Sequence, residues 1–334
     1  MARVTIADIA ERLGLSKASV SYALNGQAGV SEQTRQKVVA MAAELGWHPS
    51  FSARALSRSR ADAIGMVLRR DPALLGTEPY YMRLLEGVED VLSEAGQSLL
   101  LRMVGTTPGR DTAVYERWAG EGRVDGVIVL DRAIDDPRPA LLTRLGLPFV
   151  LHGVLPSGAG ERIEDQHRDA QLIVAHLDEL GHRRIAHITG PLGLAHEVDR
   201  RTAVRHESTA RGIAVEFAEA DYTFDTAHAR VLELLSSGIR PTALVFSNDV
   251  MAVAGLRALA DAGAHDVAVV SWDDSMLCQF SYPTVTALER YPDRAGRRSA
   301  AMLLELLDGR SWSTAAPSPS TLVVRETSTP APRP

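Results

Sequence analysis

The chain is poor in the features that mark secreted and membrane proteins. Its 334 residues include one cysteine, Cys278, so an internal disulfide is excluded and a reducing compartment is expected. No run of about 20 apolar residues is present to span a bilayer. The first residues also lack the apolar stretch of a secretory signal. We therefore expect a cytoplasmic protein in which Cys278 is a packing residue.

Lysine is scarce in this chain, and the balance of basic over acidic residues differs between its two ends. The net charge is -6 at pH 7, yet the first 60 residues hold eight basic and four acidic residues, and both lysines of the chain, Lys17 and Lys37, lie there. Chance alone can produce such a split. A basic head on an acidic body is also expected where only the head meets a polyanion. The length predicts two or three domains.

Residues 1–48 have the pattern of three short helices. Thr5 opens a capping-box pattern ahead of apolar residues at helical spacing, and Gly14 ends that segment. Ser16 is placed to cap a second helix and Ser31 a third. Because the first two helices are joined by a tight glycine-containing turn, the pattern predicts a helix-turn-helix unit.

The second helix of such a unit enters the major groove with its N-terminus first. Its outward face, expected to read bases, carries Lys17, Ala18, Ser19 and Tyr22. A lysine can donate to guanine, and an alanine methyl can touch the methyl of thymine. Hydroxyl and amide groups commonly bind phosphates. The further expected DNA contacts of the head are Thr5, Ser16, Ser21, Asn25, Ser31 and Thr34. The alternative is a small helical bundle with solvated hydroxyls.

Residues 4–68, VTIADIAERLGLSKASVSYALNGQAGVSEQTRQKVVAMAAELGWHPSFSARALSRSRADAIGMVL, resemble the N-terminal part of LacI/GalR-family transcriptional regulators. The resemblance implies that Lys17, Ala18 and Ser19 stand at base-reading positions. Members commonly have Thr in place of Ser19 and Arg in place of Tyr22, so the operator sequence does not carry over.

The resemblance also implies that residues 49–60 form a hinge helix in the minor groove. Leu56 stands at the position of the leucine that wedges between central base pairs, with Ala53 beside it. Only about two helical turns of sequence are available, so this helix is marginal alone and is expected to fold on contact with DNA. A flexible linker with Leu56 packed on the next domain is the alternative.

Residues 61–334 alternate strand-like and helix-like segments. The segments typical of buried strands are AIGMVL, QSLLLRMV, DGVIVL, LPFVLHG, RIAHIT, ALVFSND and VAVVSWDD. Amphipathic segments such as 82–95, 170–180 and 250–262 separate them. The alternation predicts an α/β body of two doubly wound parallel-sheet subdomains. The resemblance continues to the C-terminus, through ELGHRRIAHITGP, ALVFSNDVMAVAGLRALADAG, VAVVSWDDS, PTVTAL and LVVRETS. It implies a periplasmic-binding-protein-like, effector-binding and dimerisation domain with interleaved subdomains.

Parallel sheets of this kind bind ligands beyond the carboxyl ends of their strands. The resemblance places the family's ligand-binding arginine, amide and acid at Arg200, Asn248 and Asp273. Such groups suit vicinal hydroxyls or a planar polar ligand, so a sugar or related metabolite is the expected effector. The other candidate contacts are Tyr80, Tyr222 and Trp272, as an aromatic face, and the strand-end residue His152.

Several neighbouring residues have simpler structural interpretations. Asp249 is expected to cap the helix after it, and Asp274 to cap or brace a loop. Arg69 and Arg70 end the first strand, where two cations favour an acidic ligand or lie in solvent. Members usually have Asn where Gln166 stands, so the effector is not borrowed from a known member.

An enzyme is the main rival class. Asp273 and Asp274 are adjacent, so their side chains diverge, whereas a retaining glycosidase pair faces each other about 5 Å apart. The nucleophile-elbow, phosphate-loop and HExxH motifs are missing from the sequence. His182 and His187 do not share a helical face, so neither a metal nor a cofactor is expected.

A receptor of the periplasmic type and a carbohydrate-processing enzyme are the alternatives, and both leave the basic head without a role. We instead predict a transcriptional regulator, with repression expected, that binds a palindromic double-stranded DNA operator as a homodimer and responds to a small-molecule effector. The Pro-rich C-terminus, TSTPAPRP, has no heptads, so no tetramerising coil is expected.

Overall fold

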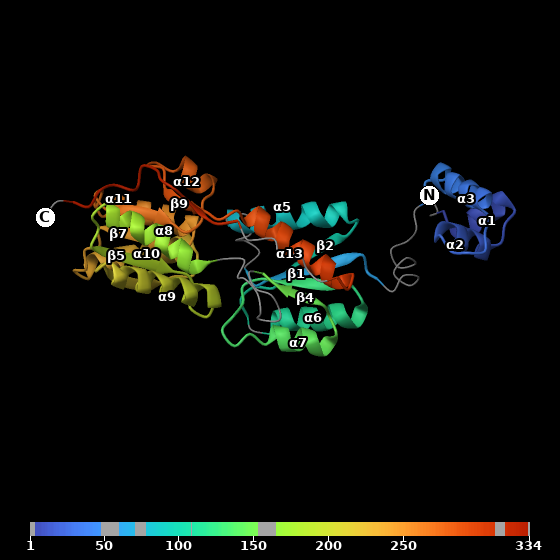
Figure 1. Cartoon of the computed structure of the whole chain (residues 1–334), viewed down its shortest axis with the longest axis horizontal. Helices are drawn as coiled ribbons and strands as arrows, with labels where there is room; N and C mark the ends of the chain where they lie inside the picture. Colours follow the sequence, from blue (N-terminus) through green and yellow to red (C-terminus); the bar gives the residue numbers. More distant parts are fainter. Residues whose placement is uncertain are drawn as a thin grey trace. The chain divides into compact units, whose positions relative to one another are not determined.

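The structure is a computed structural model that describes residues 4–47, 60–70, 78–107, 109–152, 165–310 and 318–332. The chain forms two compact units, Met1–Ala61 and Asp62–Pro334, which we call the head and the body (Figure 1). The predicted hinge residues Ala53 and Leu56 lie outside the described residues. No helix among the described residues is long and apolar enough to cross a membrane.

The head contains the three predicted helices, α1 (Ile6–Leu13), α2 (Lys17–Leu24) and α3 (Glu32–Glu44). At the start of α1 the Asp8 carboxylate accepts hydrogen bonds from the amide and the hydroxyl of Thr5, at 2.7 and 2.9 Å. Each helix contributes a completely buried aliphatic side chain to one small core: Ile9, Val20 and Val38. The predicted helix-turn-helix fold is confirmed.

The first half of the body, which we call the N-lobe, is built on a parallel sheet with strand order β2-β1-β3-β4. Its strands are β1 (Ala63–Leu68), β2 (Ser98–Met103), β3 (Gly126–Val129) and β4 (Phe149–Leu151). Helices α5 (Pro79–Glu94) and α13 (Pro292–Leu307) cover one face, and α6 (Arg110–Glu121) and α7 (Arg138–Leu145) the other (Figure 1). One expectation was wrong. The β2 segment is not a buried strand, because it lies at the sheet edge and exposes Ser98 and Arg102.

The contact between α5 and α13 returns the C-terminal part of the chain to the N-lobe. Two glycines make this crossing possible. A Cβ atom on Gly87 would lie 1.8 Å from the Asp293 carbonyl oxygen, and one on Gly296 would lie 2.2 Å from the Leu84 carbonyl oxygen. Because any side chain at either position would push the helices apart, the two glycines allow this close approach.

The second half, the C-lobe, is built on a sheet with strand order β10-β9-β8-β7-β5-β6. Its strands are β5 (Arg184–Thr189), β6 (Ala214–Glu219), β7 (Ala243–Phe246), β8 (Ala268–Ser271), β9 (Thr286–Glu289) and β10 (Thr321–Val323). Pairing is parallel except between β9 and β10. The sequence analysis did not predict three of these strands, β6, β9 and β10. The edge strands β6 and β10 have exposed residues that interrupt the apolar pattern, and β9 has only four residues. The predicted doubly wound body is confirmed.

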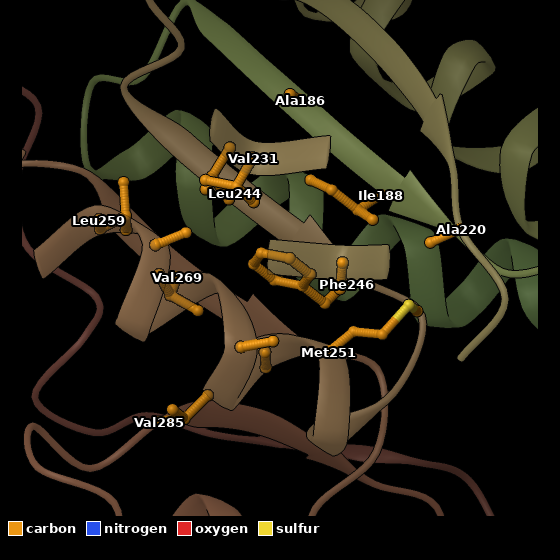
Figure 2. Packing of buried hydrophobic residues seen from close by; sticks show 14 of the residues in the cluster. Ala186, Ile188, Ala220, Val231, Leu244, Phe246, Met251, Leu259, Val269 and Val285 are labelled. Carbon is orange, nitrogen blue, oxygen red and sulfur yellow. The ribbon is translucent and has the colours of Figure 1, made fainter. Parts of the chain in front are cut away.

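Helices cover both faces of the C-lobe sheet. Helices α8 (Gln166–Glu179) and α9 (Ala195–Ala210) lie on one face, and α10 (Phe224–Ser236) and α11 (Asp249–Asp261) on the other, with the short α12 (Met276–Phe280) beside α11. Figure 2 shows Phe246 packed among Ile188, Leu244 and Met251 on the second face. Cys278 belongs to this core, where burial raises the pKa of its thiol to about 12. It is therefore a packing residue.

Candidate functional site

The outward face of α2 has the composition expected of a base-reading surface. Lys17, Ala18 and Tyr22 are exposed, and Ser19 is half-buried. The N-cap of α2 is Ser16, whose hydroxyl accepts a hydrogen bond from the Ser19 amide at 3.0 Å. The small side chains at the start of this helix leave its backbone accessible.

The polar groups around α2 are partly engaged within the head. Ser31 caps α3 by accepting from the Thr34 amide at 3.2 Å. The Asn25 amide donates to the Ser21 hydroxyl at 3.2 Å. All four side chains are exposed or half-buried, so each keeps donor or acceptor capacity beyond its local bond. Their role as phosphate contacts stays a prediction.

A cavity in the body is lined by residues of both lobes. Six of the seven candidate effector contacts line it: Arg200, Asn248, Asp273, Tyr222, Tyr80 and His152. These residues come from positions up to nearly 200 apart in the chain, and the doubly wound topology brings them together at the strand ends. That they bind an effector stays a prediction.

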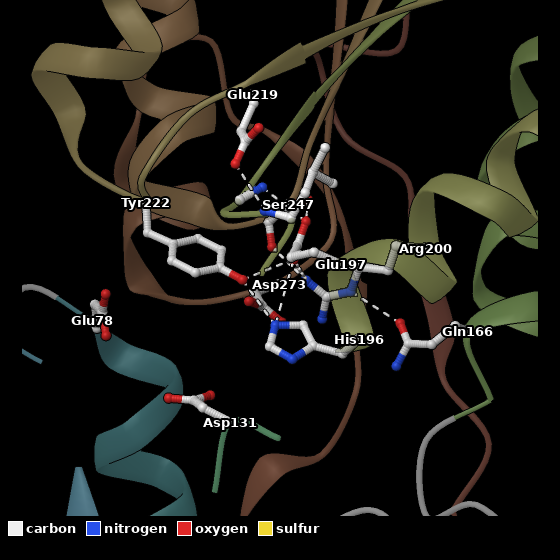
Figure 3. Close-up of polar contacts among 12 residues, drawn as sticks. Glu78, Asp131, Gln166, His196, Glu197, Arg200, Glu219, Tyr222, Ser247 and Asp273 are labelled. Atoms are coloured by element: carbon white, nitrogen blue, oxygen red, sulfur yellow. Dashed lines mark hydrogen bonds and ion pairs between the residues drawn. The ribbon is translucent and has the colours of Figure 1, made fainter. Parts of the chain in front are cut away.

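Arg200 of α9 is buried, and its guanidinium donates hydrogen bonds to three partners. Its Nη1 donates to Glu197 at 2.8 Å and to the Ser247 carbonyl at 3.0 Å, and its Nε donates to Gln166 at 2.9 Å (Figure 3). Its guanidinium carbon lies 5.1 Å from the centre of the Trp272 ring. No hydrogen bond described for Arg200 uses Nη2, so this nitrogen is the part of the side chain left for a ligand in the cavity.

Glu197 is the anion that holds this network together. Burial alone would raise the pKa of its carboxyl, but Arg200 and His196 beside it, and the Ser247 hydroxyl, lower that pKa to about 2. Ser247 donates to Glu197 at 2.7 Å and Tyr222 donates to it at 2.9 Å. Tyr222 has a backbone φ of 70°, a conformation that L residues rarely adopt. The glutamate thus orients one tyrosine and one arginine of the cavity wall.

The start of α11 corrects one expectation. Asn248, and not Asp249, is the N-cap: its backbone is extended and its Oδ1 accepts from the Met251 amide at 2.8 Å. Asp249 lies in the first turn and lines the cavity. Burial, with the nearby Asp273 charge, raises the pKa of Asp249 to about 7.

The N-lobe wall of the cavity is a buried ion cluster. Arg70 pairs with Asp131 at 3.0 Å and with Glu78 at 3.3 Å, and it donates to the Tyr81 hydroxyl at 2.8 Å. The guanidinium also faces the Tyr222 ring at 5.3 Å. The expectation that Arg70 lies in solvent is wrong, because this cation is largely buried and lines the cavity; that it favours an acidic ligand stays a prediction.

Asp273 and His152 are held on opposite sides of the cavity. Arg290 donates to Asp273 at 2.7 Å and also lies 5.2 Å from the centre of the Tyr80 ring. The Tyr80 hydroxyl is 3.2 Å from Nε2 of His152, whose Nδ1 is 3.0 Å from the Ser299 hydroxyl. These contacts fix the rings that face the cavity.

Trp272 does not provide an aromatic face to a ligand. It is completely buried and lies outside the cavity lining. Its ring stacks on His187 at 5.7 Å and packs behind Arg200. Trp272 directly follows β8 and belongs to the C-lobe core, so its ring packs against the guanidinium of Arg200 from the core side. Asp274 braces a loop as expected, through a 2.6 Å ion pair with Arg325.

Sequence reasoning missed a larger group of cavity residues. They are Glu78, Tyr81, Asp131, Gln166, His196, Asp199, Asp249 and Arg290. Two of them follow a strand end: Asp131 after β3 and Arg290 after β9. The strand-end rule, applied to the predicted strands, would have found Asp131 but not Arg290, because β9 was not predicted. Glu78 is the N-cap of α5 and the others lie on helices, where no local signal marks them.

The helix-turn-helix head and a periplasmic-binding-protein-like body define a class of regulators. Residues 5–50 match the family described as "Bacterial regulatory proteins, lacI family", and residues 174–328 match "Periplasmic binding protein-like domain". The HTH-type transcriptional regulator CelR of Thermobifida fusca is 32% identical over 323 residues, which are 92% of this chain and 93% of that protein. The ribose operon repressor of Escherichia coli strain K12 is 30% identical over 309 residues, 90% of this chain and 92% of its own.

Solved structures agree with these matches. A CelR–cellobiose complex is 30% identical with a TM-score of 0.72, covering 97% of this chain and 100% of its own. A Lac repressor dimer bound to operator and the anti-inducer ONPF is 27% identical with a TM-score of 0.86, covering 98% and 100%. The chain belongs to the LacI family of transcriptional regulators, as the resemblance predicted. Its relatives regulate transcription and are not enzymes, so the carbohydrate-processing alternative is not supported.

Proposed function

We propose that this regulator binds a palindromic operator as a homodimer and that a neutral sugar in the body cavity changes its operator affinity. The observation that carries the proposal is the cavity itself, where both lobes present polar groups and tyrosines around one space. Ligand in such a cleft favours one relative arrangement of the lobes, and a change in operator affinity follows if the ligand binds the two arrangements unequally.

The pairing of the charges supports a neutral ligand over an anionic one. Of the four arginines in the lining, three are each matched by a carboxylate: Arg70 by Asp131, Arg200 by Glu197 and Arg290 by Asp273. A phosphate bound to any of these three would have to displace its partner, and only Arg132 has no carboxylate partner among the ion pairs of the described residues. Sugar hydroxyls both donate and accept, so they can bond to paired ions without breaking them. The cellobiose bound to the CelR relative is a ligand of this class.

The effector proposal is tested on the full-length protein with cellobiose, ribose, glucose 6-phosphate and hypoxanthine in a thermal-shift and calorimetric panel. A neutral sugar is expected to raise the melting temperature and to change operator affinity, because a ligand that binds only the folded state stabilises it. Binding of the phosphate or the nucleobase alone would contradict the neutral-sugar proposal. Operator binding with and without the sugar shows whether it induces or co-represses.

A matched pair of variants tests whether the cavity is the binding site. Asp273 lines the cavity and pairs with Arg290, whereas the adjacent Asp274 lies outside the lining and pairs with Arg325. Asp273→Asn is expected to weaken sugar binding about tenfold or more, since a charged hydrogen bond contributes about 1.5–3 kcal/mol. Asp274→Asn removes an equally well-paired buried charge and is expected to leave sugar affinity unchanged.

An exposed apolar patch supports the dimer. Met276, Phe280 and Tyr282 on and just after α12 are 66%, 79% and 95% exposed. Large apolar side chains gathered in this way are typical of subunit contacts. A second copy of this chain is the proposed occupant, because the Lac repressor relative is a dimer on its operator and two-fold protein symmetry matches a palindromic site. Phe280→Ser with Tyr282→Ser is expected to give monomers by light scattering, whereas Ile239→Ser, at another exposed apolar residue, leaves the dimer intact.

The last part of the proposal concerns how residues 49–60, the predicted hinge helix, bind DNA. We infer from the sequence that paired segments of residues 49–60 enter the minor groove at the centre of the operator, with Leu56 as the wedge and Ala53 beside it. The predicted base-reading residues Lys17, Ala18, Ser19 and Tyr22 would then read two half-sites about one helical turn or more apart. Selection of bound fragments from random duplex DNA tests this. A two-fold symmetric consensus is expected, and indiscriminate binding to every duplex would refute it.

A further inference from the structure

Helices α8 and α9 bring three potential metal ligands together on the C-lobe. They are His167 of α8 and His206 and Glu207 of α9, and their ligand atoms all lie within 4.8 Å of one another. None of the three lines the body cavity. The cluster is therefore separate from the proposed effector site.

The spacing within this cluster suits a small divalent ion. Nδ1 of His206 lies 3.3 Å from Oε1 of Glu207, which is about the separation of two ligand atoms on a tetrahedral Zn²⁺ with bonds of about 2.0–2.1 Å. The His167 ring lies 5.9 Å from the His206 ring, at 80° to it. Both imidazoles are exposed, so the His167 ring can turn toward the pair without disturbing the core.

The two oxygens of Glu207 have different partners, which leaves one oxygen for a cation. Oε2 accepts from Arg211 at 2.5 Å, and Oε1 faces His206. Arg211 thus orients the carboxylate through the oxygen that the ion does not use.

We propose that His167, His206 and Glu207 form a site for a late first-row divalent metal ion of the Zn²⁺ type, with water completing the coordination. Two imidazoles and one carboxylate are ligands that such ions prefer over Mg²⁺, which favours an all-oxygen octahedron. The ion links the first turn of α8 to the last turns of α9. His167 follows Gln166, whose Oε1 accepts from Arg200 of α9, so the link lies next to a contact between the same two helices at the cavity.

The test uses untagged full-length protein freed of metal with a chelator, titrated with ZnCl₂ by calorimetry, and with MgCl₂ as the comparison ion. One Zn²⁺ per chain is expected to bind, with no response to Mg²⁺. His167→Gln and His206→Gln are each expected to weaken Zn²⁺ binding about tenfold or more, since even residues that only support a ligand contribute about tenfold. His265→Gln, at another exposed histidine, is the matched control and keeps full affinity.

A second measurement reads the ligands directly. Co²⁺ bound in place of Zn²⁺ is expected to give visible absorption bands that both His→Gln variants lose. Unchanged Zn²⁺ stoichiometry and affinity in the double variant, or no binding to the parent protein, overturns the site. Sugar binding and operator binding are measured in parallel, so that a failure of this site is distinct from a failure of the proposed function.

Discussion

The Nη1 of Arg200 lies 2.8 Å from Oε1 of Glu197, and the two side chains are 4% and 0% exposed. A predicted ligand-binding residue is thus also half of a buried ion pair. Removing one partner of such a pair leaves the other charge uncompensated, which typically destabilises a protein by about 3–5 kcal/mol. Substitutions of Arg200 therefore test stability and binding together.

Arg200→Ala is expected to abolish the effector response and to lower the free energy of unfolding by about 3–5 kcal/mol, because Glu197 stays buried and charged. Urea unfolding measures the second effect. Adding Glu197→Gln to Arg200→Ala removes the stranded charge and is expected to restore much of the stability but not the response. If the double variant responds to effector normally, Arg200 does not contact the ligand.

The Glu197 carboxylate predicts that the free energy of unfolding falls at acidic pH. The folded-state pKa of Glu197 is lowered from 4.5 to about 2, so its contribution is fully present above about pH 4.5 and is lost as the pH falls toward 2. The difference corresponds to about 3 kcal/mol. Glu197→Gln is expected to flatten the fall in unfolding free energy between pH 5 and pH 3. An unchanged slope would contradict the ion pair.

The carboxyl group of Asp249 predicts the opposite pH dependence, a free energy of unfolding that falls as the pH rises. Its folded-state pKa is raised from 3.8 to about 7, so the folded state binds an extra proton and loses stability as the pH rises through this interval. Asp249→Asn is expected to stabilise the protein at pH 8 by on the order of 4 kcal/mol and to have little effect at pH 4. Asp225→Asn, at the first turn of α10 and exposed, is the control for the loss of a carboxylate as such.

The two lysines of the chain form a matched pair for the DNA surface. Both are exposed, Lys17 at the start of α2 and Lys37 on α3. Lys17→Ala is expected to cost about 1–3 kcal/mol of operator affinity and to relax specificity at one base position. Lys37→Ala removes the same charge and is expected to leave specificity unchanged. Competition binding with operator variants measures both, and equal effects would refute the base-reading role of Lys17.

Leu56→Ala tests the hinge. A leucine wedge acts only where the duplex is kinked, so the substitution is expected to lower specific operator affinity about tenfold or more while non-specific binding to random duplex stays nearly constant. Gel-shift titrations on both DNAs measure the ratio. An equal loss on both would count against the wedge.

Local patterns in the sequence predicted the elements with strong periodicity. The head was predicted helix by helix, because its caps at Thr5, Ser16 and Ser31 and its apolar stripes are local signals that the structure confirms. The fully buried strands β1 and β7 were also predicted. Edge strands such as β6 were not, since one exposed side weakens the apolar run that marks a strand.

The sequence by itself determined the family, the helix-turn-helix head and the doubly wound body, because these follow from local periodicity and from motifs in a fixed order. Only the tertiary structure decided that Arg70 meets Asp131, that Trp272 supports Arg200 from the core, and that Asn248 caps α11. Each of these contacts depends on the three-dimensional surroundings of its residues. Burial and charge pairing depend on those surroundings, and no spacing along the chain encodes them.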